Sequence, residues 1–188
     1  MKTFVIGLTG ASGSIYGLRL IEVLAAEGFK LHVIATKTAV QVIRFETGRN
    51  LQEFITGLGS HVHLEDPDNF FAPPASGSYP TDGMIIAPCS MGTLAEIANG
   101  ISGNLLDRAA DVCLKERRPL ILLARETPLN SINLENMLKL TQAGAMIFPA
   151  CPGFYHKPKS LEDVIDFMVG KLLDALGVEH QLFKKWGS

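Results

Sequence analysis

The chain has 188 residues, a length that suits one domain with a full hydrophobic core. Hydrophobic residues make up 47% of it, which excludes a disordered chain, and 17 Lys and Arg against 19 Asp and Glu give a net charge of −2. No long basic block occurs, so we expect no nucleic acid among its partners.

Cysteine usage and hydropathy indicate a cytoplasmic protein. The three cysteines are far apart and form neither a CxxC pair nor a Cys/His cluster with metal-ligand spacing, so we expect reduced thiols and no bound metal. No apolar stretch approaches the length that spans a bilayer, and the apolar run near the N-terminus is too short for a signal peptide. We therefore expect no membrane partner.

The first quarter of the chain alternates short apolar runs with helical patterns. Residues 4–6 predict a strand, and a glycine-rich turn leads into a helix over residues 14–27. A second strand over residues 31–35 precedes a second helix over residues 38–47. A glycine follows each helix directly, as is common where helices end.

Residues 66–82 predict a long loop that contains Pro73 and Pro74. A loop of this length inside a compact domain is usually functional or disordered. The two prolines and the nearby Phe70 and Phe71 favour an ordered lid over a flexible tether.

Strands and helices also alternate in the second half of the chain. Strands are predicted at residues 84–87, 120–124 and 145–148, and helices at 93–99, 104–116, 134–142 and from 160 onward. A C-terminal tail begins at about residue 177. This order predicts an α/β fold, a single domain over residues 1–188 with a doubly wound, Rossmann-like or flavodoxin-like parallel sheet covered by helices on both faces. Ligands of such sheets bind beyond the carboxyl ends of the strands.

The turn after the first strand, residues 7–14, is rich in small residues. The helix behind it could offer amide groups to an anion, or the turn could bind nothing. Its glycine spacing is not that of a dinucleotide site, and the second strand ends at Thr36 and Lys37 instead of at a ribose-binding acid. A mononucleotide therefore fits better than NAD, while NADP is excluded less firmly because Lys37 could contact a phosphate.

Polar residues also follow the later strands. Ser90 and Thr93 place hydroxyls before a helix, and Thr93 and Glu96 have capping-box spacing, so this turn could be an ordinary helix cap. Together with the turn after the first strand, it could also form a phosphate-binding site. Arg125 and Glu126 directly follow a buried strand. They could form a surface ion pair, but we favour a functional role because ligands bind at this edge of the sheet.

Other candidates admit two interpretations each. Arg108 and Lys115 lie two turns apart on one helix, where they could hold one anion or form a solvated face. Tyr155 could donate to a phosphate or pack against its neighbours, and His156 is interpreted as a structural or surface histidine rather than a base.

Six segments of the chain are similar to the UbiX/Pad family of flavin prenyltransferases. They are TGASG at residues 9–13, APCS at 87–90, RAADV at 108–112, LKERRPL at 114–120, RETPL at 125–129 and GFYH at 153–156. This resemblance implies residues that bind FMN, which are Gly10, Ala11, Ser12, Thr36, Ser90, Met91, Gly92, Thr93 and Arg125. It also implies residues that bind dimethylallyl phosphate, which are Arg108, Lys115, Tyr155 and Lys171.

The resemblance also implies catalytic residues and chemistry. Ser12, Glu46, Glu126 and Trp186 match the family's catalytic positions. Reduced FMN would be prenylated without a metal, first at a nitrogen and then by ring closure at an aromatic carbon. Glu126 would transfer a proton during ring closure, Ser12 and Glu46 would order the site, and Trp186 would shield the allylic cation.

Two positions differ from the family's usual residues. Lys171 stands where the family often has Arg, and it keeps the charge but loses the bidentate fork. Thr36 stands where the family often has Ser and keeps the hydroxyl. The resemblance further implies a homo-dodecamer with sites shared between subunits, and a UbiD-type decarboxylase that receives the prenylated flavin.

Two other functions are weighed against this one. A flavin-dependent decarboxylase of cysteine-containing substrates would need a histidine just after the second strand, where residues 36–39 read Thr-Lys-Thr-Ala. A non-catalytic flavin carrier or electron shuttle would have no use for a second phosphate site. Convergence of Arg108, Lys115 and Tyr155 would therefore disfavour a shuttle.

Overall fold

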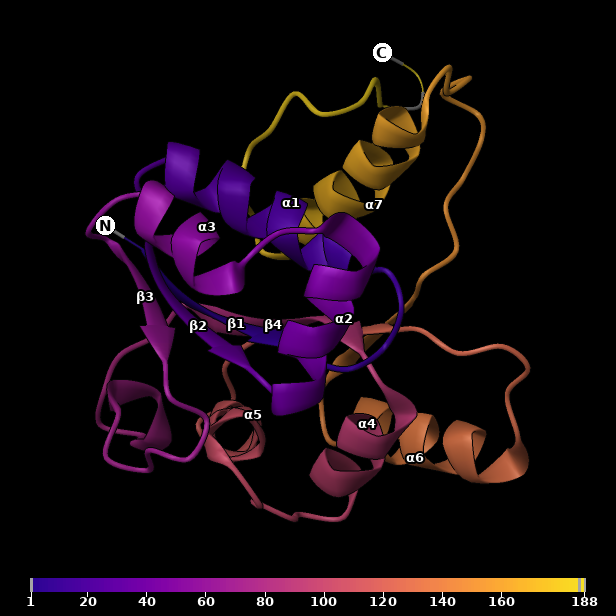
Figure 1. The fold of residues 1–188 in the computed structure, drawn as a ribbon. Coiled ribbons are helices and arrows are strands. Elements are labelled where there is room, and N and C mark those ends of the chain that lie inside the picture. The colour runs from indigo at the N-terminus through magenta and orange to yellow at the C-terminus, as the bar shows by residue number, and fades with distance from the viewer. Residues whose placement is uncertain (1, 186, 188) are drawn as a thin grey trace.

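A single parallel sheet organises the chain in the computed structural model, which describes residues 2–185 and 187 (Figure 1). The described residues form six strands in the order β3-β2-β1-β4-β5-β6. These strands are β1 (Thr3–Leu8), β2 (Lys30–Ala35), β3 (Val62–Glu65), β4 (Gly83–Cys89), β5 (Leu120–Ala124) and β6 (Met146–Pro149). The predicted doubly wound α/β fold is confirmed.

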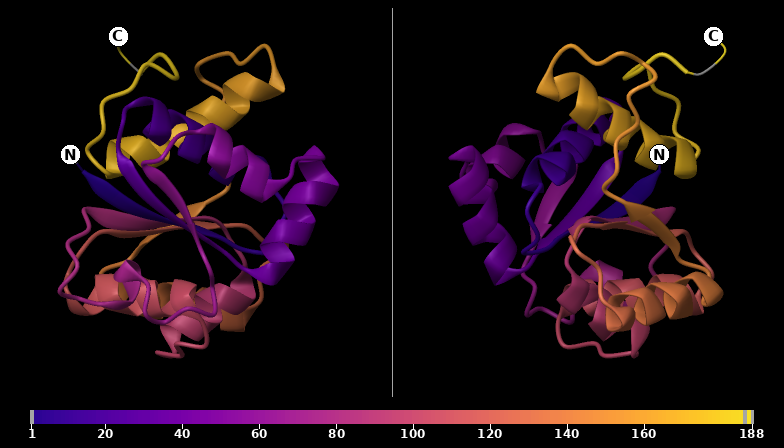
Figure 2. Two further views of the ribbon diagram at one scale, coloured as in Figure 1. Left: turned by 60° about the vertical axis from the view of Figure 1, so that its left-hand side comes forward. Right: turned by 90° about the vertical axis from the view of Figure 1, so that its right-hand side faces the viewer.

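Helices cover both faces of the sheet (Figure 2). One face carries α1 (Ser14–Ala26), α2 (Lys37–Thr47), α3 (Leu51–Gly57) and α7 (Leu161–Ala175). The other carries α4 (Met91–Ala98), α5 (Leu105–Lys115) and α6 (Ser131–Gln142). Each face has its own core because successive strand residues point to opposite sides of the sheet.

The sheet changes winding direction between its two central strands. β1 pairs with β2 on one side and with β4 on the other, so Gly7 lies opposite Ile34 and Ile86. The chain leaves β1 toward α1 on one face and leaves β4 toward α4 on the other face. The carboxyl ends of these strands therefore flank the crevice in which doubly wound folds bind ligands.

Gly17 brings α1 unusually close to the sheet. A side chain at this position would overlap the carbonyl oxygen of Ala87 in β4 and the side chain of Leu8 in β1. The absence of a Cβ atom therefore allows the start of α1 to lie directly above the ends of both central strands.

The sequence patterns missed two elements and placed the starts of α4 and α6 two and three residues too late. β3 has four residues, reads Val-His-Leu-Glu and buries only Val62, so it lacked the continuous apolar run of the other strands. The seven-residue helix α3 was also too short to show a helical period. α6 begins at Ser131 and not at residue 134, because Asn130 and Asn133 form a reciprocal capping box.

The predicted loop after β3 is ordered around a 3₁₀ turn, η1 (Pro73–Ala75). Pro74 is buried, and Ala72 belongs to the core beneath α4 and α5. Within the described part of the chain, no helix is both long and apolar enough to cross a membrane.

Candidate active site

Thr9 joins the turns that follow the two central strands. Its buried hydroxyl donates to the carbonyl oxygen of Pro88 at 2.8 Å and accepts from the amide of Ser90, also at 2.8 Å. A single side chain therefore fixes the distance between the end of β1 and the start of α4. The sequence signal was a hydroxyl directly after a buried strand, but its role as a bridge was not predicted.

The opening of α4 leaves backbone amides available to a ligand. Ser90 caps the helix, and its hydroxyl accepts from the amide of Thr93 at 3.4 Å. The predicted capping box of Thr93 and Glu96 is wrong, because the helix starts at Met91 and Ser90 is the cap. Helix geometry gives the amides of Met91 and Gly92 no acceptor within the helix. A Cβ atom on Gly92 would have no neighbour within 4 Å, so the space above this turn is open.

The opening of α1 is occupied by an acid from the same chain. The Glu46 carboxylate, at the end of α2, accepts from the Gly13 amide at 3.1 Å, the Ser14 amide at 2.9 Å and the Ser14 hydroxyl at 2.7 Å. The amides that the sequence suggested for an external anion therefore bind an internal one. Burial raises the pKa of Glu46, but hydrogen bonds from Ser12, Ser14 and Gly13 outweigh burial and hold the pKa below its ordinary value.

The opening of α2 lies against the same glycine-rich turn. Thr36 caps α2 and accepts from the amide of Ala39 at 3.1 Å. Gly10 sits so close to Thr38 that an added Cβ atom would be 2.5 Å from the threonine methyl group. Lys37 forms an ion pair with the carboxylate of Asp68 at 2.9 Å. The cation that could have bound the extra phosphate of NADP therefore already has a partner within the chain.

A cavity of about 710 Å³ lies beside the α1 opening. Ser12 and Glu46 line it together with apolar side chains of α1 and α7, namely Ile15, Leu161 and Ile165. Its volume is in the range of pockets that bind small molecules. Most of the remaining lining is charged and is formed by Arg19, Glu22, Arg49, Glu162 and Asp166. The predicted ordering residues Ser12 and Glu46 therefore belong to a cavity with a mixed apolar and charged lining.

Arg125 and Glu126 occupy the end of β5, as predicted. The amide of Arg125 donates to the carbonyl oxygen of Cys89 at 3.1 Å, which ties this turn to the end of β4. Glu126 is exposed and accepts from the amide of Thr127 at 2.9 Å. Among the described residues no ion pair joins Arg125 to Glu126, so the surface-pair interpretation does not apply.

The four residues implied for the donor phosphate fall into two separate pairs. Arg108 and Lys115 lie on α5, beneath the sheet in Figure 1. Tyr155 packs edge-on against Phe167 of α7, above the sheet, and Lys171 is one turn further along α7. The sheet separates the two pairs, so within one chain the four residues do not converge.

Trp186 lies outside the described residues. His156 stacks on Phe167 at a ring distance of 4.9 Å, and both its ring nitrogens are buried without a hydrogen-bond partner. This packing agrees with a structural histidine.

No group of three or more His, Cys, Asp or Glu side chains in the described part of the chain could hold a metal ion.

Comparison with known proteins identifies the family. Residues 1–173 match the model of the Flavoprotein family. The chain is 51% identical to the flavin prenyltransferase UbiX of Alkalihalophilus pseudofirmus, over 99% of this chain and 96% of that protein. The chain belongs to the UbiX flavin prenyltransferase family. UbiX of Pseudomonas aeruginosa is 45% identical over 99% of this chain and 94% of that protein.

Solved UbiX structures share the whole fold. AnUbiX, in complex with FMN and dimethylallyl pyrophosphate, superposes with a TM-score of 0.94 at 42% identity, over 100% of this chain and 98% of that one. A dodecameric FMN-dependent UbiX-like decarboxylase from Escherichia coli O157:H7 gives a TM-score of 0.93 at 38% identity, over 99% and 100%. The peptidyl-cysteine decarboxylase EpiD is 16% identical with a TM-score of 0.61, which shows a common fold alone.

Proposed function

We propose that this UbiX family member joins a dimethylallyl group from dimethylallyl phosphate to reduced FMN. The observation that carries the proposal is full-length similarity to UbiX prenyltransferases, including one solved with FMN and an allylic donor. The open amides at the start of α4 support it, since a helix N-terminus is suited to the phosphate of a mononucleotide.

The residues at the sheet edge fit FMN. Ser90, Met91, Gly92 and Thr93 at the opening of α4 would hold it, with Gly10, Ala11 and Ser12 after β1, Thr36 before α2 and Arg125 after β5. The open space above Gly92 and the close contact of Gly10 with Thr38 both favour backbone approach by a flat ligand. The flavin, when bound in its reduced form, supplies a nucleophilic nitrogen and aromatic carbon.

The donor phosphate would be bound between subunits. Because α5 and α7 lie on opposite faces of the sheet, Arg108 and Lys115 of one chain would meet Tyr155 and Lys171 of another. The dodecameric state of a UbiX-like relative supports an assembly with such shared sites. A homo-dodecamer is therefore proposed for this chain as well.

The chain's own groups would act on the donor in two stages. As the carbon–oxygen bond breaks, its electron pair goes to the phosphate oxygen, where cationic side chains and the Tyr155 hydroxyl stabilise the charge. The reduced flavin would supply the nitrogen that bonds to the donor carbon, and the proton displaced from that nitrogen would leave with the phosphate. Ring closure then adds a proton to the alkene and removes one from the aromatic ring, and Glu126 is proposed to carry these transfers.

Ser12 and Glu46 would order the allylic group in the cavity that they line. Trp186 is proposed to shield the reacting carbon from water.

The chain would act in the cytoplasm as a single flavin-binding domain with a tail over residues 177–188. Its product would serve a UbiD-type decarboxylase, in keeping with its family.

The direct test is incubation of the purified protein with reduced FMN and dimethylallyl phosphate without oxygen, followed by mass spectrometry of the flavin. Transfer adds one five-carbon unit and releases one phosphate. A non-catalytic carrier would bind the flavin and return it with its mass unchanged, and that result would refute the proposal. Parallel assays with dimethylallyl pyrophosphate would show which donor is preferred.

A further inference from the structure

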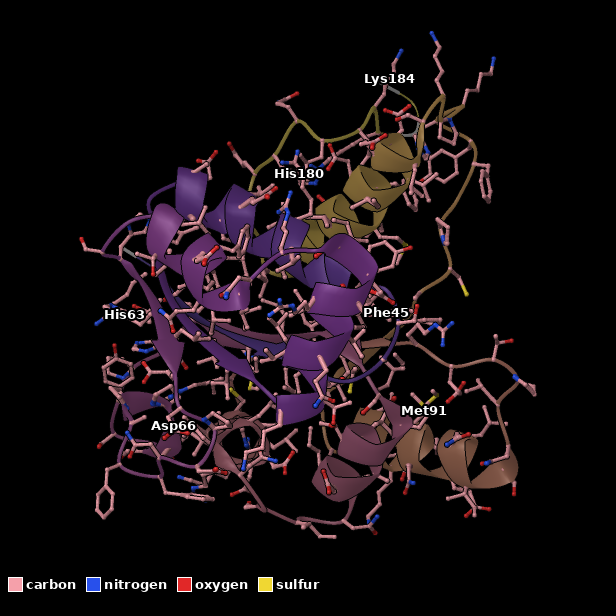
Figure 3. The ribbon with its side chains drawn as sticks, viewed as in Figure 1. Phe45, His63, Asp66, Met91, His180 and Lys184 are labelled. Atoms are coloured by element: carbon pink, nitrogen blue, oxygen red, sulfur yellow. The ribbon has the colours of Figure 1, made fainter. Side chains whose placement is uncertain are left out.

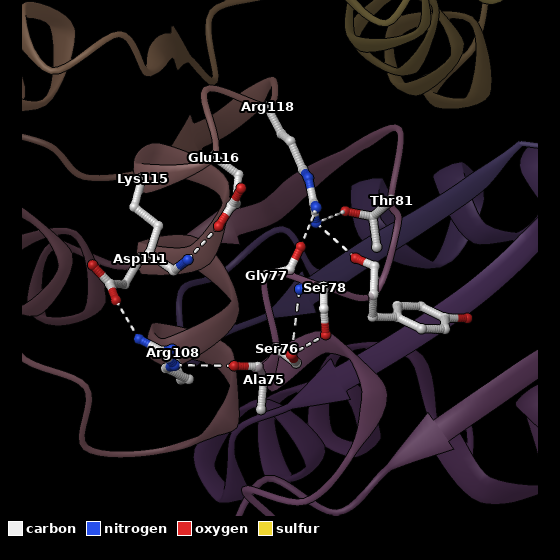
Figure 4. A network of polar contacts seen from close by, with 11 residues as sticks. Ala75, Ser76, Gly77, Ser78, Thr81, Arg108, Asp111, Lys115, Glu116 and Arg118 are labelled. Carbon is white, nitrogen blue, oxygen red and sulfur yellow. Dashed lines mark hydrogen bonds and ion pairs between the residues drawn. The ribbon is translucent and has the colours of Figure 1, made fainter.

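A short polar loop packs against the α5 residues proposed to bind the donor phosphate. We call residues 75–81 the clamp loop (Figure 4). The Arg108 guanidinium donates through Nε to the Ala75 carbonyl oxygen at 3.1 Å and through Nη1 to Asp111 at 2.6 Å. Two of its three nitrogens are therefore engaged by protein acceptors, which fixes the plane of the guanidinium.

The same loop lies against Lys115. The Lys115 ammonium pairs with Glu116, and an added Cβ atom on Gly77 would lie 2.6 Å from its nitrogen. Gly77 has no left-handed backbone angle, so an added side chain would not strain the backbone but would displace the ends of the Lys115 and Glu116 side chains. The position of Gly77 thus sets the space available to the ammonium group.

Arg118 binds the middle and the end of the clamp loop, as Figure 4 shows. Its Nη2 donates to the Gly77 carbonyl oxygen at 2.6 Å, and its Nη1 donates to the Tyr79 carbonyl oxygen at 2.8 Å and to the Thr81 hydroxyl at 3.3 Å. One planar fork therefore bridges three points of the loop. A lysine has a single donor group and could not reproduce this geometry.

The sheet anchors the loop at Tyr79. The Tyr79 hydroxyl is 2.9 Å from Nε2 of His32 in β2, and Nδ1 of His32 is 2.6 Å from the Glu65 carboxylate. His32 is only 2% exposed, so this anchor belongs to the interior. The loop is thus fastened to β2 on one side and to Arg118 on the other, which leaves its Ala75 and Gly77 end against α5.

We propose that Arg118 is a positioning residue for the donor phosphate. It holds the clamp loop so that Ala75 and Gly77 place the Arg108 guanidinium and the Lys115 ammonium for phosphate binding. Arg118 itself does not contact the substrate in this arrangement. The inference rests on the proposed function, because it assigns those two cations to the donor.

The first test compares Arg118→Met and Arg118→Lys with the matched control Arg117→Met, which removes an exposed neighbouring charge. We expect Arg118→Met to raise the KM for dimethylallyl phosphate about tenfold, with kcat and FMN affinity within about twofold of wild type. Arg118→Lys should show a smaller rise, since an ammonium group can keep part of the contact with the loop but not the planar fork, and Arg117→Met should show none.

Two further measurements separate positioning from general destabilisation. Amide hydrogen exchange across residues 75–81 should accelerate in Arg118→Met while exchange in β1 and β4 stays unchanged. Gly77→Ala keeps Arg118 but pushes on the Lys115 ammonium, so it should also raise KM without lowering the melting temperature. An unchanged KM in Arg118→Met, or a KM that rises only together with loss of FMN binding, would overturn the inference.

The inference can fail independently of the proposed function. If the wild-type protein transfers no prenyl group, the proposed function is refuted. The positioning role of Arg118 can then still be tested by measuring the affinity for inorganic phosphate. Calorimetric titration of the assembled protein should give a phosphate Kd about tenfold weaker for Arg118→Met than for wild type or Arg117→Met. Equal phosphate affinities would reject the positioning role.

Discussion

At the scale of single residues, Glu46 supplies α1 with an internal anion. Its carboxylate binds the Gly13 and Ser14 amides that a free helix N-terminus would leave to solvent or to a ligand. Glu46 also lines the cavity proposed for the allylic group. The same carboxylate therefore has a structural and a proposed catalytic role, and the two can be separated by experiment.

Replacing Glu46 by Gln should weaken both roles. Loss of the charge at the helix N-terminus should lower the free energy of unfolding by about 1 kcal/mol at pH 7. Because the pKa of Glu46 is lowered by folding, its stabilisation is present above the ordinary pKa and is lost as pH falls through the lowered one. Denaturant titrations should show the gap between variant and wild type closing below about pH 4. A constant gap down to pH 2 would contradict this assignment.

Asp107 should show the opposite dependence on pH. It is 1% exposed, and its Oδ1 has no hydrogen-bond partner. Burial, followed by the charge of Glu96, raises its pKa to about 6. A raised pKa contributes stability below the ordinary value that is lost as pH rises through 6.

Asp107→Asn should therefore stabilise the protein at pH 8 by roughly 1–3 kcal/mol and have little effect near pH 4. The Asn104 amide group can still donate to the new side chain, as it donates to Asp107 at 2.7 Å. Melting temperatures across this pH range would measure the difference. A variant that is destabilised at pH 8 would show that the ionised carboxylate is instead satisfied in the folded protein.

At the scale of elements, the opening of α4 is built to leave space. Gly92 lies in the first turn of the helix, and an added methyl group would have no protein neighbour within 4 Å. Gly57 at the end of α3 shares this property and lies away from the sheet edge. The two glycines therefore have similarly open surroundings, and a ligand is proposed to approach only Gly92.

Gly92→Ala should raise the melting temperature slightly, since Ala favours helix by up to about 1 kcal/mol over Gly. It should nevertheless weaken FMN binding, because the methyl group enters the space proposed for the ligand. Flavin fluorescence titration measures the affinity. Gly57→Ala is the matched control, with a similar stability change and wild-type FMN affinity expected. If both variants bind FMN as wild type does, the flavin does not approach α4 at Gly92.

The elements also show which features could be predicted from sequence. The buried strands β1, β4 and β5 are continuous apolar runs, and the polar residues just after them were predicted to meet at one edge. The short edge strand β3 carries no such run and was missed. Glu46 could not be paired with the α1 amides from sequence, since 33 residues and an intervening strand separate them. The role of Arg118 could not be predicted, because two of its three partners are backbone carbonyl oxygens, which leave no sequence signal.

At the scale of the whole molecule, the two faces of the sheet carry different halves of the proposed donor site. The exposed surface of α6 is consistent with assembly, because Ile132, Leu134 and Leu138 are all more than half exposed. Phe45 on α2 is 92% exposed, and its ring projects away from the helix (Figure 3). Apolar side chains exposed in this way are commonly covered by other subunits.

Complementation between two inactive variants would test the shared site. Lys115→Ala and Lys171→Ala should each lower transfer strongly when expressed alone. Co-expressed in equal amounts, they should recover roughly a quarter of wild-type activity, since that share of randomly formed interfaces has both lysines. Co-expression of Lys115→Ala with Arg108→Ala, which lie on the same helix, should give no recovery. Absence of recovery in the first pair would refute a donor site shared between α5 of one chain and α7 of another.

In the proposed shared site, the separation of α5 from α7 by the sheet would make catalysis depend on protein concentration. A dissociated subunit would keep its flavin edge, because β1, β4 and β5 belong to one chain, but it would hold only half of the cations for the leaving group. Dilution below the assembly constant would therefore produce a flavin-loaded but silent monomer. The turnover rate would then depend on how many subunits are assembled, and a low protein concentration alone would inactivate the enzyme.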